Sequence, residues 1–348
     1  MRKTNKKNLC LIAVAATFYL CSSFVYAQGV KDEKQEEQLK KITEDVTSLE
    51  KEIEGKKALK ARWNSSFRTS YGYENNPKLA ALHKGDHFVA SRYSLNYRKT
   101  FAERNQFGWA FDLNHQNYSE VTDISSTLSH MRFDYKLAFT KNYVLGTAYD
   151  FSYSVYAFDQ NSTYYDHKMA LNIQHRVTAN FYHQLQLEMG WKLYENALAY
   201  LNSTSTYQDN LRKDTREAVE YSFGYTFNKR FSSNARLARS FNNSNASFQD
   251  YYDYHAWDLS PRFFYKVNDR FSLNGSYSYQ FKDYTSRIVS NGSFEQKDRI
   301  STGKAGLSYQ LNARHSFTFD YTYRQNASND ILSDYTASTY EGGWRYIF

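Results

Sequence analysis

The sequence predicts an all-β protein, an antiparallel transmembrane β-barrel of about 14 strands (within a range of about 12–16) over residues 61–348. Three observations predict this fold. Side chains alternate between apolar and polar over segments of about ten residues, which is the length that a tilted strand needs to cross a membrane. Short and long connections alternate along the chain. Aromatic residues make up 18% of the chain although its mean hydropathy is −0.76, as expected for strands with one face in lipid and the other in water.

Residues 1–27 have the pattern of a secretory signal peptide. Four basic residues lie within residues 1–8, the apolar run Leu9–Leu20 follows, and a polar stretch ends at Ala27. The apolar run is too short to cross a bilayer as a helix, so we expect cleavage after Ala27. A lipoprotein anchor at Cys21 is the alternative, and the bulky residues that precede this cysteine disfavour it.

Removal of the signal peptide narrows the chemistry of the mature chain. Both cysteines, Cys10 and Cys21, lie inside the signal, so we expect no disulfide, thiolate metal site or cysteine nucleophile. The signal also removes four of the 44 bases and none of the 36 acids, which lowers the formal net charge from +8 to +4. The remaining bases form no block, and the sequence therefore indicates no nucleic-acid partner.

Residues 28–60 predict a short periplasmic α-helix ahead of the barrel. Within residues 31–57 almost every residue is charged or polar, and apolar residues recur at heptad spacing: Leu39, Ile42, Val46, Leu49 and Ile53. Two interpretations remain open. The segment is either a solvated amphipathic linker helix, or a short coiled coil through which the protein forms a homo-oligomer.

From residue 61 onward the chain is organised in alternating strands. The segment that starts at His315 places Phe317, Phe319 and Tyr321 on one face, with Thr318 and Asp320 on the other. Counting such segments gives fourteen strands, centred near residues 68, 93, 111, 134, 149, 172, 189, 222, 236, 261, 278, 305, 320 and 342. An even number of strands places both ends of the barrel on the same side of the membrane.

The connections between these strands are of two kinds. Six short turns lie near Ala102, Asn142, Ala179, Lys229, Asp269 and Ala313, and longer polar stretches such as 195–214 and 241–250 separate them. We expect the short turns on the periplasmic side and the long loops outside the cell. The turns repeat at a regular interval, which raises the alternative of a β-propeller. Because each interval holds two long strands instead of four short ones, the pattern favours the barrel.

The last strand resembles the C-terminal signature of Gram-negative outer-membrane barrels. In TYEGGWRYIF, the residues Tyr340, Gly342, Trp344, Tyr346 and Phe348 share one face. The resemblance is to barrels of the porin type and implies that the chain is recognised by the barrel assembly machinery and lies among outer-membrane lipids. A helix ahead of a barrel is similar in layout to porins of the sucrose type. No motif selects one family. Residues 158–164 are too few for the in-folded constriction loop of general trimeric porins.

The polar face of the strands is the predicted functional surface. It carries sixteen bases and eight acids, an excess that indicates an anion-preferring lumen, because rings of Arg or Lys select anions in pores. The alternative is that the charges pair across strands and only stabilise the wall. The bases are Arg62, Arg68, Arg92, Arg98, Arg132, Lys136, Arg176, Lys192, Arg216, Arg236, Arg262, Lys266, Lys282, Lys304, Arg324 and Arg345, and the acids are Asp112, Asp134, Asp150, Glu188, Glu220, Asp258, Asp320 and Glu341. Among the bases, we expect Arg92 and Arg98 to contribute most to selectivity, since the first strand offers them no acid.

Other kinds of site are weakly indicated. Most histidines, His130 among them, are placed at strand ends or in loops, and His115 and His175 fall on the lipid-facing side without an obvious Ser or Asp partner, so we expect no enzyme. No spacing indicates a metal or a cofactor. The five tryptophans and the strand-end tyrosines are interpreted as girdles at the membrane surfaces.

The predicted function is a channel of the outer membrane through which small hydrophilic solutes diffuse, with anions preferred. The alternative from another class is a structural or secretion-associated barrel whose helix at 31–57 binds a periplasmic partner. A barrel enzyme ranks third.

Overall fold

The computed structural model describes residues 61–348 apart from 81–83, 102–103, 201–206, 248–249 and 291. The predicted signal peptide (1–27) and helix (28–60) lie outside these residues, as does part of the turn near Ala102. Within the described part, no helix is long and apolar enough to cross a membrane. The two helices present are short 3₁₀ turns, η1 (Thr122–Ile124) and η2 (Gln160–Ser162).

The described chain is a succession of β-strands. In order they are β1 (Arg62–Glu74), β2 (Asp86–Phe101), β3 (Asn105–Tyr118), β4 (Ser126–Ala138), β5 (Tyr143–Tyr156), β6 (Tyr164–Arg176), β7 (Phe181–Tyr200), β8 (Tyr207–Thr226), β9 (Phe231–Ser244), β10 (Tyr254–Leu259), β11 (Arg262–Lys266), β12 (Phe271–Ile288), β13 (Glu295–Gln310), β14 (His315–Ser328) and β15 (Tyr335–Ile347).

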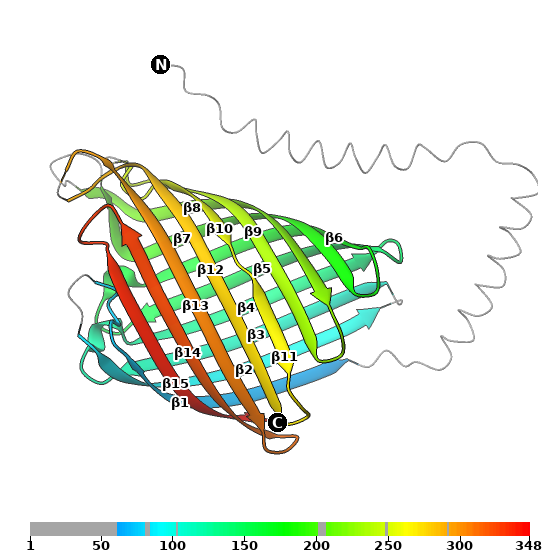
Figure 1. The fold of residues 1–348 in the computed structure, drawn as a ribbon. Coiled ribbons are helices and arrows are strands. Elements are labelled where there is room, and N and C mark those ends of the chain that lie inside the picture. Colours follow the sequence, from blue (N-terminus) through cyan, green and yellow to red (C-terminus); the bar gives the residue numbers. More distant parts are fainter. Residues whose placement is uncertain (1–60, 81–83, 102–103, 201–206, 248–249, 291) are drawn as a thin grey trace, which may run out of the picture. The chain divides into compact units, whose positions relative to one another are not determined.

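The strands form one closed antiparallel sheet. Apart from β10 and β11, which do not pair with each other, each strand pairs with its neighbours in the chain, and β1 also pairs with β15, so that the sheet has no free edge (Figure 1). The short strands β10 and β11 both pair with β9 and β12. They are two parts of a single barrel strand, and the barrel therefore has 14 strands, as predicted.

A proline explains why this strand is interrupted. Pro261 has no backbone N–H and cannot complete the hydrogen-bond ladder, so it separates β10 from β11. The break changes nothing in the pairing: Leu259 faces Leu237 and Arg262 faces Asn234, which is the same register on both sides of the proline. Ser260 exchanges backbone hydrogen bonds with Arg236, and the carbonyl of Pro261 accepts one from Tyr277.

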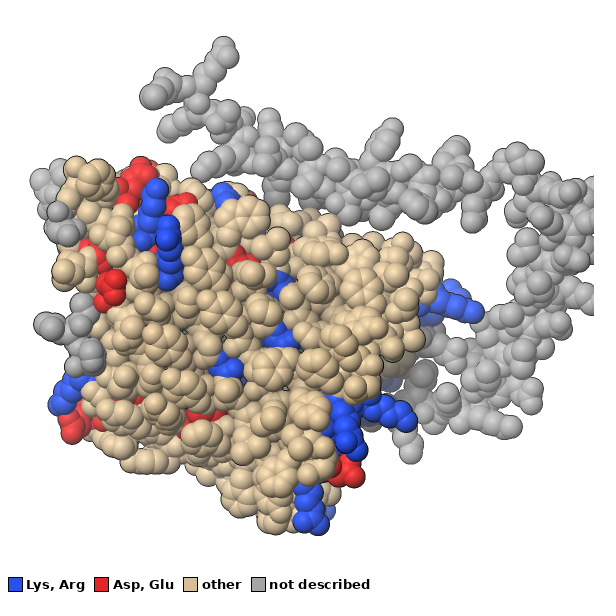
Figure 2. Space-filling view, in the orientation of Figure 1, with Lys and Arg blue, Asp and Glu red and all other residues tan. Residues whose placement is uncertain are grey.

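The two faces of the sheet differ in polarity. Large apolar side chains are exposed on the outer face of nearly every strand, including Trp63, Val89, Met169 and Phe319. Figure 2 shows a surface made mostly of uncharged side chains on the side of the barrel that carries β12–β15. An exposed apolar band of this kind would be costly in water and is the face that lipid accommodates. The alternate side chains of each strand are mostly polar and lie inside the barrel.

The short turns share one hydrogen-bond arrangement. In three of them an asparagine (Asn228, Asn268 or Asn312) accepts hydrogen bonds from the backbone N–H groups two and three residues further on. The hydroxyls of Thr140 and Thr178 do the same in two others. Asn and Thr side chains favour this local bonding, which explains the regular short turns at one end of the barrel.

At the other end the connections are longer and two expectations are wrong. The stretch 195–214, expected as a loop, mostly extends β7 and β8, which are 20 residues long each. The stretch 241–250 likewise begins inside β9. Register shifts after Leu193 mark where the β7–β8 pairing becomes irregular. Polar composition suggested loops, but strands of a barrel can continue beyond the lipid as polar ribbons.

Side-chain hydrogen bonds organise the long-loop end. The carboxylate of Asp330 accepts hydrogen bonds from the hydroxyl of Ser290 and from the backbone N–H groups of Ser290 and Leu332. Burial acts to raise the pKa of Asp330, but these hydrogen bonds outweigh it and hold the pKa below its usual value. The ionised carboxylate thereby ties the β12–β13 connection to the β14–β15 connection.

The seam between the first and last strands carries a charged bridge. Arg68 of β1 lies 2.8 Å from Asp320 of β14 and 2.9 Å from Glu341 of β15, so one guanidinium joins three strands across the closure. Beside it, Arg345 of β15 faces Arg68 in the pairing and donates to the hydroxyl of Ser66. Among the residues that the structure describes, Arg68 is therefore paired with two acids and Arg345 with none.

We expect Arg68→Leu to destabilise the barrel. The substitution leaves Asp320 and Glu341 side by side without their common partner, at a cost of about 1–3 kcal/mol in the free energy of unfolding. The matched control is Arg345→Leu, which removes a base with no carboxylate partner and should change that free energy by less than about 0.5 kcal/mol. Urea unfolding of the barrel in lipid vesicles, followed by tryptophan fluorescence, compares the two. Equal losses would show that the ion pairs do not hold the seam.

Candidate functional site: the polar inner face

Most acids of the inner face are held by arginines on neighbouring strands. Arg236 of β9 lies 3.3 Å from Glu220 and 2.9 Å from Asp258, on the strands to either side. Together with Arg68 at the seam, two arginines thus occupy four carboxylates. Inner-face charges that face each other on adjacent strands are close enough to pair, as the register of the sheet dictates.

A second network runs across β2 to β5. Arg92 lies 3.0 Å from Asp112, and Arg132 lies 3.2 Å from Asp150. Between the two carboxylates lies His130, whose Nε2 is 2.9 Å from Asp150 and whose Nδ1 is 3.9 Å from Asp112. The five side chains form a continuous belt of alternating basic and acidic groups on one wall of the barrel.

This network corrects two expectations. The expectation that Arg92 lacks an acidic neighbour is wrong: β1 offers no acid, but Asp112 of β3 does. Arg98 has no carboxylate within 4.0 Å among the described residues. His130 was placed at a strand end, whereas it lies inside β4 with two aspartates as neighbours. In the described contacts no serine or threonine hydroxyl bonds to His130, so the arrangement supplies no activated nucleophile.

More acids than bases of the inner face are held in these ion pairs. Six of the eight predicted inner-face acids pair with only four arginines, and Lys266 pairs separately with Asp269 in its turn, 2.7 Å away. Among the described residues, Asp134 and Glu188 are the two of these acids without a basic partner within 4.0 Å. The predicted bases with no carboxylate within 4.0 Å in this part of the chain are Arg62, Arg98, Lys136, Arg176, Lys192, Arg216, Arg262, Lys282, Lys304, Arg324 and Arg345. The ion pairs therefore leave eleven of the predicted bases and two of the predicted acids without an oppositely charged partner within 4.0 Å.

Near the long-loop end, tyrosines and bases alternate on the inner face of β6 to β8. The ammonium of Lys192 lies 3.6 Å from the ring centre of Tyr164 and 4.7 Å from that of Tyr194. The guanidinium of Arg212 lies 4.4 Å from Tyr194 and 3.2 Å from Tyr252. Cations over ring faces gain roughly 0.5–2 kcal/mol each, depending on how well water is excluded.

A similar set occupies β10 and β12. The ammonium of Lys282 lies 3.9 Å from the ring centre of Tyr254 and 4.4 Å from that of Tyr284. Its Nζ also donates a 2.7 Å hydrogen bond to the hydroxyl of Tyr284. Arg287 lies over Tyr251 and Tyr284, at 4.2 and 4.9 Å. We refer to both sets together as the tyrosine–cation cluster: Tyr164, Lys192, Tyr194, Arg212, Tyr251, Tyr252, Tyr254, Lys282, Tyr284 and Arg287.

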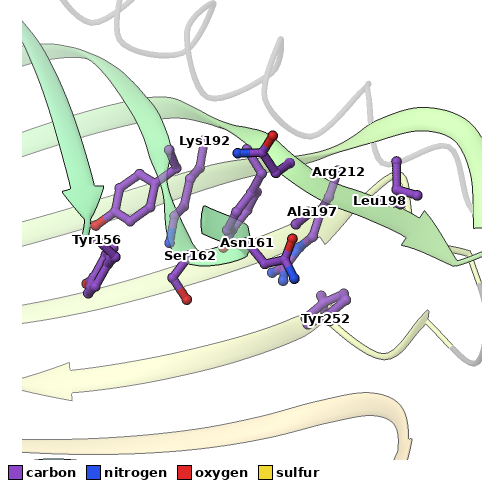
Figure 3. A pocket seen from close by; sticks show the side chains of 11 residues that line it. Tyr156, Asn161, Ser162, Lys192, Ala197, Leu198, Arg212 and Tyr252 are labelled. Carbon is purple, nitrogen blue, oxygen red and sulfur yellow. The ribbon is translucent and has the colours of Figure 1, made fainter. Parts of the chain in front are cut away.

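The cluster surrounds two adjoining cavities. The larger, of about 580 Å³, lies under the η2 turn, and Figure 3 shows Lys192, Arg212 and Tyr252 around it. The smaller, of about 310 Å³, continues along the wall toward β12. Its charged lining comprises six bases and two acids: Lys168, Lys192, Arg212, Arg216, Lys282 and Arg287 against Asp166 and Asp214. Lys168 pairs with Asp166 and Arg212 with Asp214, at 3.1 and 2.5 Å.

Part of this site was missed in the sequence. Lys192, Arg216 and Lys282 were predicted on the inner face, but Arg212 was assigned to a loop and Arg287 follows a register shift after Asp283. The strand-end tyrosines were interpreted as membrane girdles, which is wrong for Tyr164, Tyr194, Tyr254 and Tyr284. The alternation along the strands could have identified them, because Tyr194 and Tyr284 lie two residues from Lys192 and Lys282 and therefore share their face. The tryptophans do lie outside, with Trp63 and Trp257 exposed.

Metal chemistry finds no support in the described part of the chain. No group of three or more His, Asp, Glu or Cys residues lies close enough there to hold a metal ion.

Comparison with known proteins supports the fold. No protein-family model and no curated protein sequence matches the chain. Among solved structures, OmpT, an outer membrane protein of Vibrio cholerae, is similar with a TM-score of 0.50 and 11% identity, over 83% of this chain and 97% of that one. The outer-membrane-expressed form of OmpT gives 0.50 and 10%, over 84% and 98%. The outer membrane channel DcaP of Acinetobacter baumannii gives 0.52 and 8%, over 83% and 97%.

At these identities the likeness concerns the fold alone. The resemblance expected from the sequence is confirmed at that level: the chain folds as a closed 14-strand antiparallel barrel of the outer-membrane porin type, and no single family is identified.

Proposed function

We propose that the protein is an outer-membrane channel through which small hydrophilic solutes diffuse, with anions preferred. The observation that carries the proposal is the imbalance on the inner face: within the described residues, eleven bases but only two acids of the predicted set lack an oppositely charged partner within 4.0 Å. Unpaired charges of one sign along a narrow passage raise the local concentration of the opposite ion. The ion pairs themselves stabilise the wall and contribute little net field.

The size of the barrel supports a passage. Barrels of about eight strands are filled by their own side chains, and barrels of about 16–18 strands leave an aqueous channel, so 14 strands lie near the open end of this range. The connection between β5 and β6 holds only the short η2 turn. A segment of this length does not fold deeply into the lumen as a constriction.

The proposal includes the location and the N-terminal segment. A signal peptide at 1–27 would carry the chain across the inner membrane, and the barrel would then insert among outer-membrane lipids with its short turns in the periplasm. The helix at 31–57 would lie in the periplasm, where Leu39, Ile42, Val46, Leu49 and Ile53 would form the contact of a homo-oligomer. A structural or secretion-associated barrel remains the competing function, and the absence of ion flow would favour it.

We expect the purified protein to form steady conducting channels in planar lipid bilayers. A water-filled lumen of about 14 strands should pass potassium and chloride without an applied stimulus. The measurement is single-channel current in KCl, with the same preparation heat-unfolded before addition as the control. Folded protein that inserts but carries no current would contradict the channel and favour the structural barrel.

We expect the channel to prefer chloride over potassium, measured as the zero-current potential across a KCl gradient. Screening acts over about 8–10 Å at physiological salt, so the preference should be modest and should fall as salt rises. Replacing Arg98, Lys136 and Lys304 with Gln removes three unpaired bases and should weaken the preference.

The control for this measurement is the double variant Arg92→Gln with Asp112→Asn. It removes one base and its paired acid, so the net inner charge is unchanged and the zero-current potential should stay close to that of the unmodified channel. A cation-selective channel, or equal effects of the triple and the double variant, would contradict the proposed role of the unpaired bases.

A further inference from the structure

We propose that the tyrosine–cation cluster is a binding site for a solute with several negatively charged oxygen groups, either carboxylates or phosphates. This inference rests on the proposed function and deepens it, because it names the class of anion that the channel would take up. The site would lie in the smaller cavity, at the long-loop end of the inner face.

Four bases of this cavity are held in no ion pair, although Lys282 faces Asp298 in the β12–β13 pairing. Within the described residues, Lys192, Arg216, Lys282 and Arg287 make no ion pair within 4.0 Å, although Asp166 and Asp214 line the same space. Those two acids are already occupied by Lys168 and Arg212. A binding site for an anion needs free positive charge, and this part of the inner face gathers it in one cavity of about 310 Å³.

Ring faces hold three of these bases in place without neutralising them. Lys192, Lys282 and Arg287 each lie within 5 Å of two tyrosine ring centres. The attraction comes from the ring quadrupole, so a ring adds no negative charge that would cancel the charge of the base. A carboxylate partner would fix the side chain equally well but would cancel that charge. Fixed side chains lose less freedom when they bind a solute, which favours affinity.

The cluster also selects against uncharged aromatic or sugar rings. Tyr194 lies against both Lys192 and Arg212, and Tyr284 lies against both Lys282 and Arg287. With their faces covered by cations, these rings are not free to stack on a solute. What the cavity offers instead is N–H and O–H donors, which match a ligand rich in oxygen acceptors.

The spread of the bases favours a ligand with more than one charged group. Arg216 on β8 and Lys282 on β12 are separated by β9 and by β10, which is about 14 Å along the sheet at a strand spacing of about 4.8 Å. A chloride ion is too small to bridge bases that lie this far apart. A tricarboxylate or a molecule with two phosphates can bridge bases from different strands, and each added contact strengthens binding.

The test is isothermal titration calorimetry of the full-length protein in detergent with citrate, inorganic phosphate or acetate, at constant ionic strength. We expect citrate to bind more tightly than acetate by at least about tenfold, with phosphate between them. Replacing Lys192 and Lys282 with Gln should weaken citrate binding by about tenfold or more. The matched control replaces Lys136 and Lys304, two unpaired lysines elsewhere on the inner face, and should change it by less than about twofold.

Several results would overturn the inference. The first is the absence of citrate binding to the unmodified protein, and the second is equal affinity for citrate and acetate. The third is an equal loss of citrate affinity in the two double variants, which would mean that only the average charge matters. If the Lys192/Lys282 variant does not fold, Arg287→Gln replaces it, with an expected loss of at least about threefold. Calorimetry requires no ion flow, so the two proposals can fail separately. A protein that binds citrate without conducting would contradict the channel and support the binding site. A protein that conducts but does not bind citrate would support the channel and contradict the binding site.

Discussion

Closure of the sheet is the constraint on which the rest of the structure depends. Once β1 pairs with β15, the described sheet has no free edge, which is what a β-structure in hydrocarbon requires. Closure also divides the residues into two sets by parity, one outside and one inside. The outer set is rich in exposed aromatic and aliphatic side chains, and the inner set holds most of the charge that the strands carry.

The register that closure imposes then decides which charges meet. Arg92, Arg132 and Arg236 reach acids on adjacent strands because the pairing places them side by side, and Arg68 reaches Glu341 on the adjacent β15 and Asp320 on β14 beyond it. Arg68 and Arg236 each bind two acids. A guanidinium has enough donors to serve two carboxylates, so few arginines satisfy many acids. The remaining bases are left without partners, and it is this remainder, more than the raw composition, that gives the inner face its sign. Stability of the wall and selectivity of the passage thus depend on different arginines and lysines.

Much of the fold follows from local patterns that the sequence displays directly. Strict alternation in segments such as the one from His315 identified the strands, and the Asn or Thr of the short turns identified one end of the barrel. The strand at Pro261 was predicted as one element, and the pairing on both sides of the proline agrees. The ends of β7 and β8 were not predicted, because polar residues such as Asn210 and Asp214 suit a loop as well as a ribbon beyond the lipid.

The inner face was harder to predict than the strands. Parity assigned Lys192 and Lys282 correctly, but which acid meets which base depends on register, and the partner of Arg92 on β3 could not be identified from β1 alone. The role of Tyr194 and Tyr284 was missed because a tyrosine near a strand end suits both a membrane girdle and a lumen. That residues of β8 and β12 line one cavity becomes visible only in the folded sheet.

The central claim is that unpaired bases make the lumen of a water-filled barrel positive. It is tested most directly by the reversal potential across a gradient of N-methylglucamine gluconate, whose cation and anion are of similar size. Because size hardly distinguishes the two ions, the sign of the potential reports the charge of the passage. The account predicts a potential with the sign expected when gluconate is the more permeant ion. The size of this potential should decrease toward zero as the salt concentration rises. A potential of the opposite sign, or one that does not respond to salt, would contradict it.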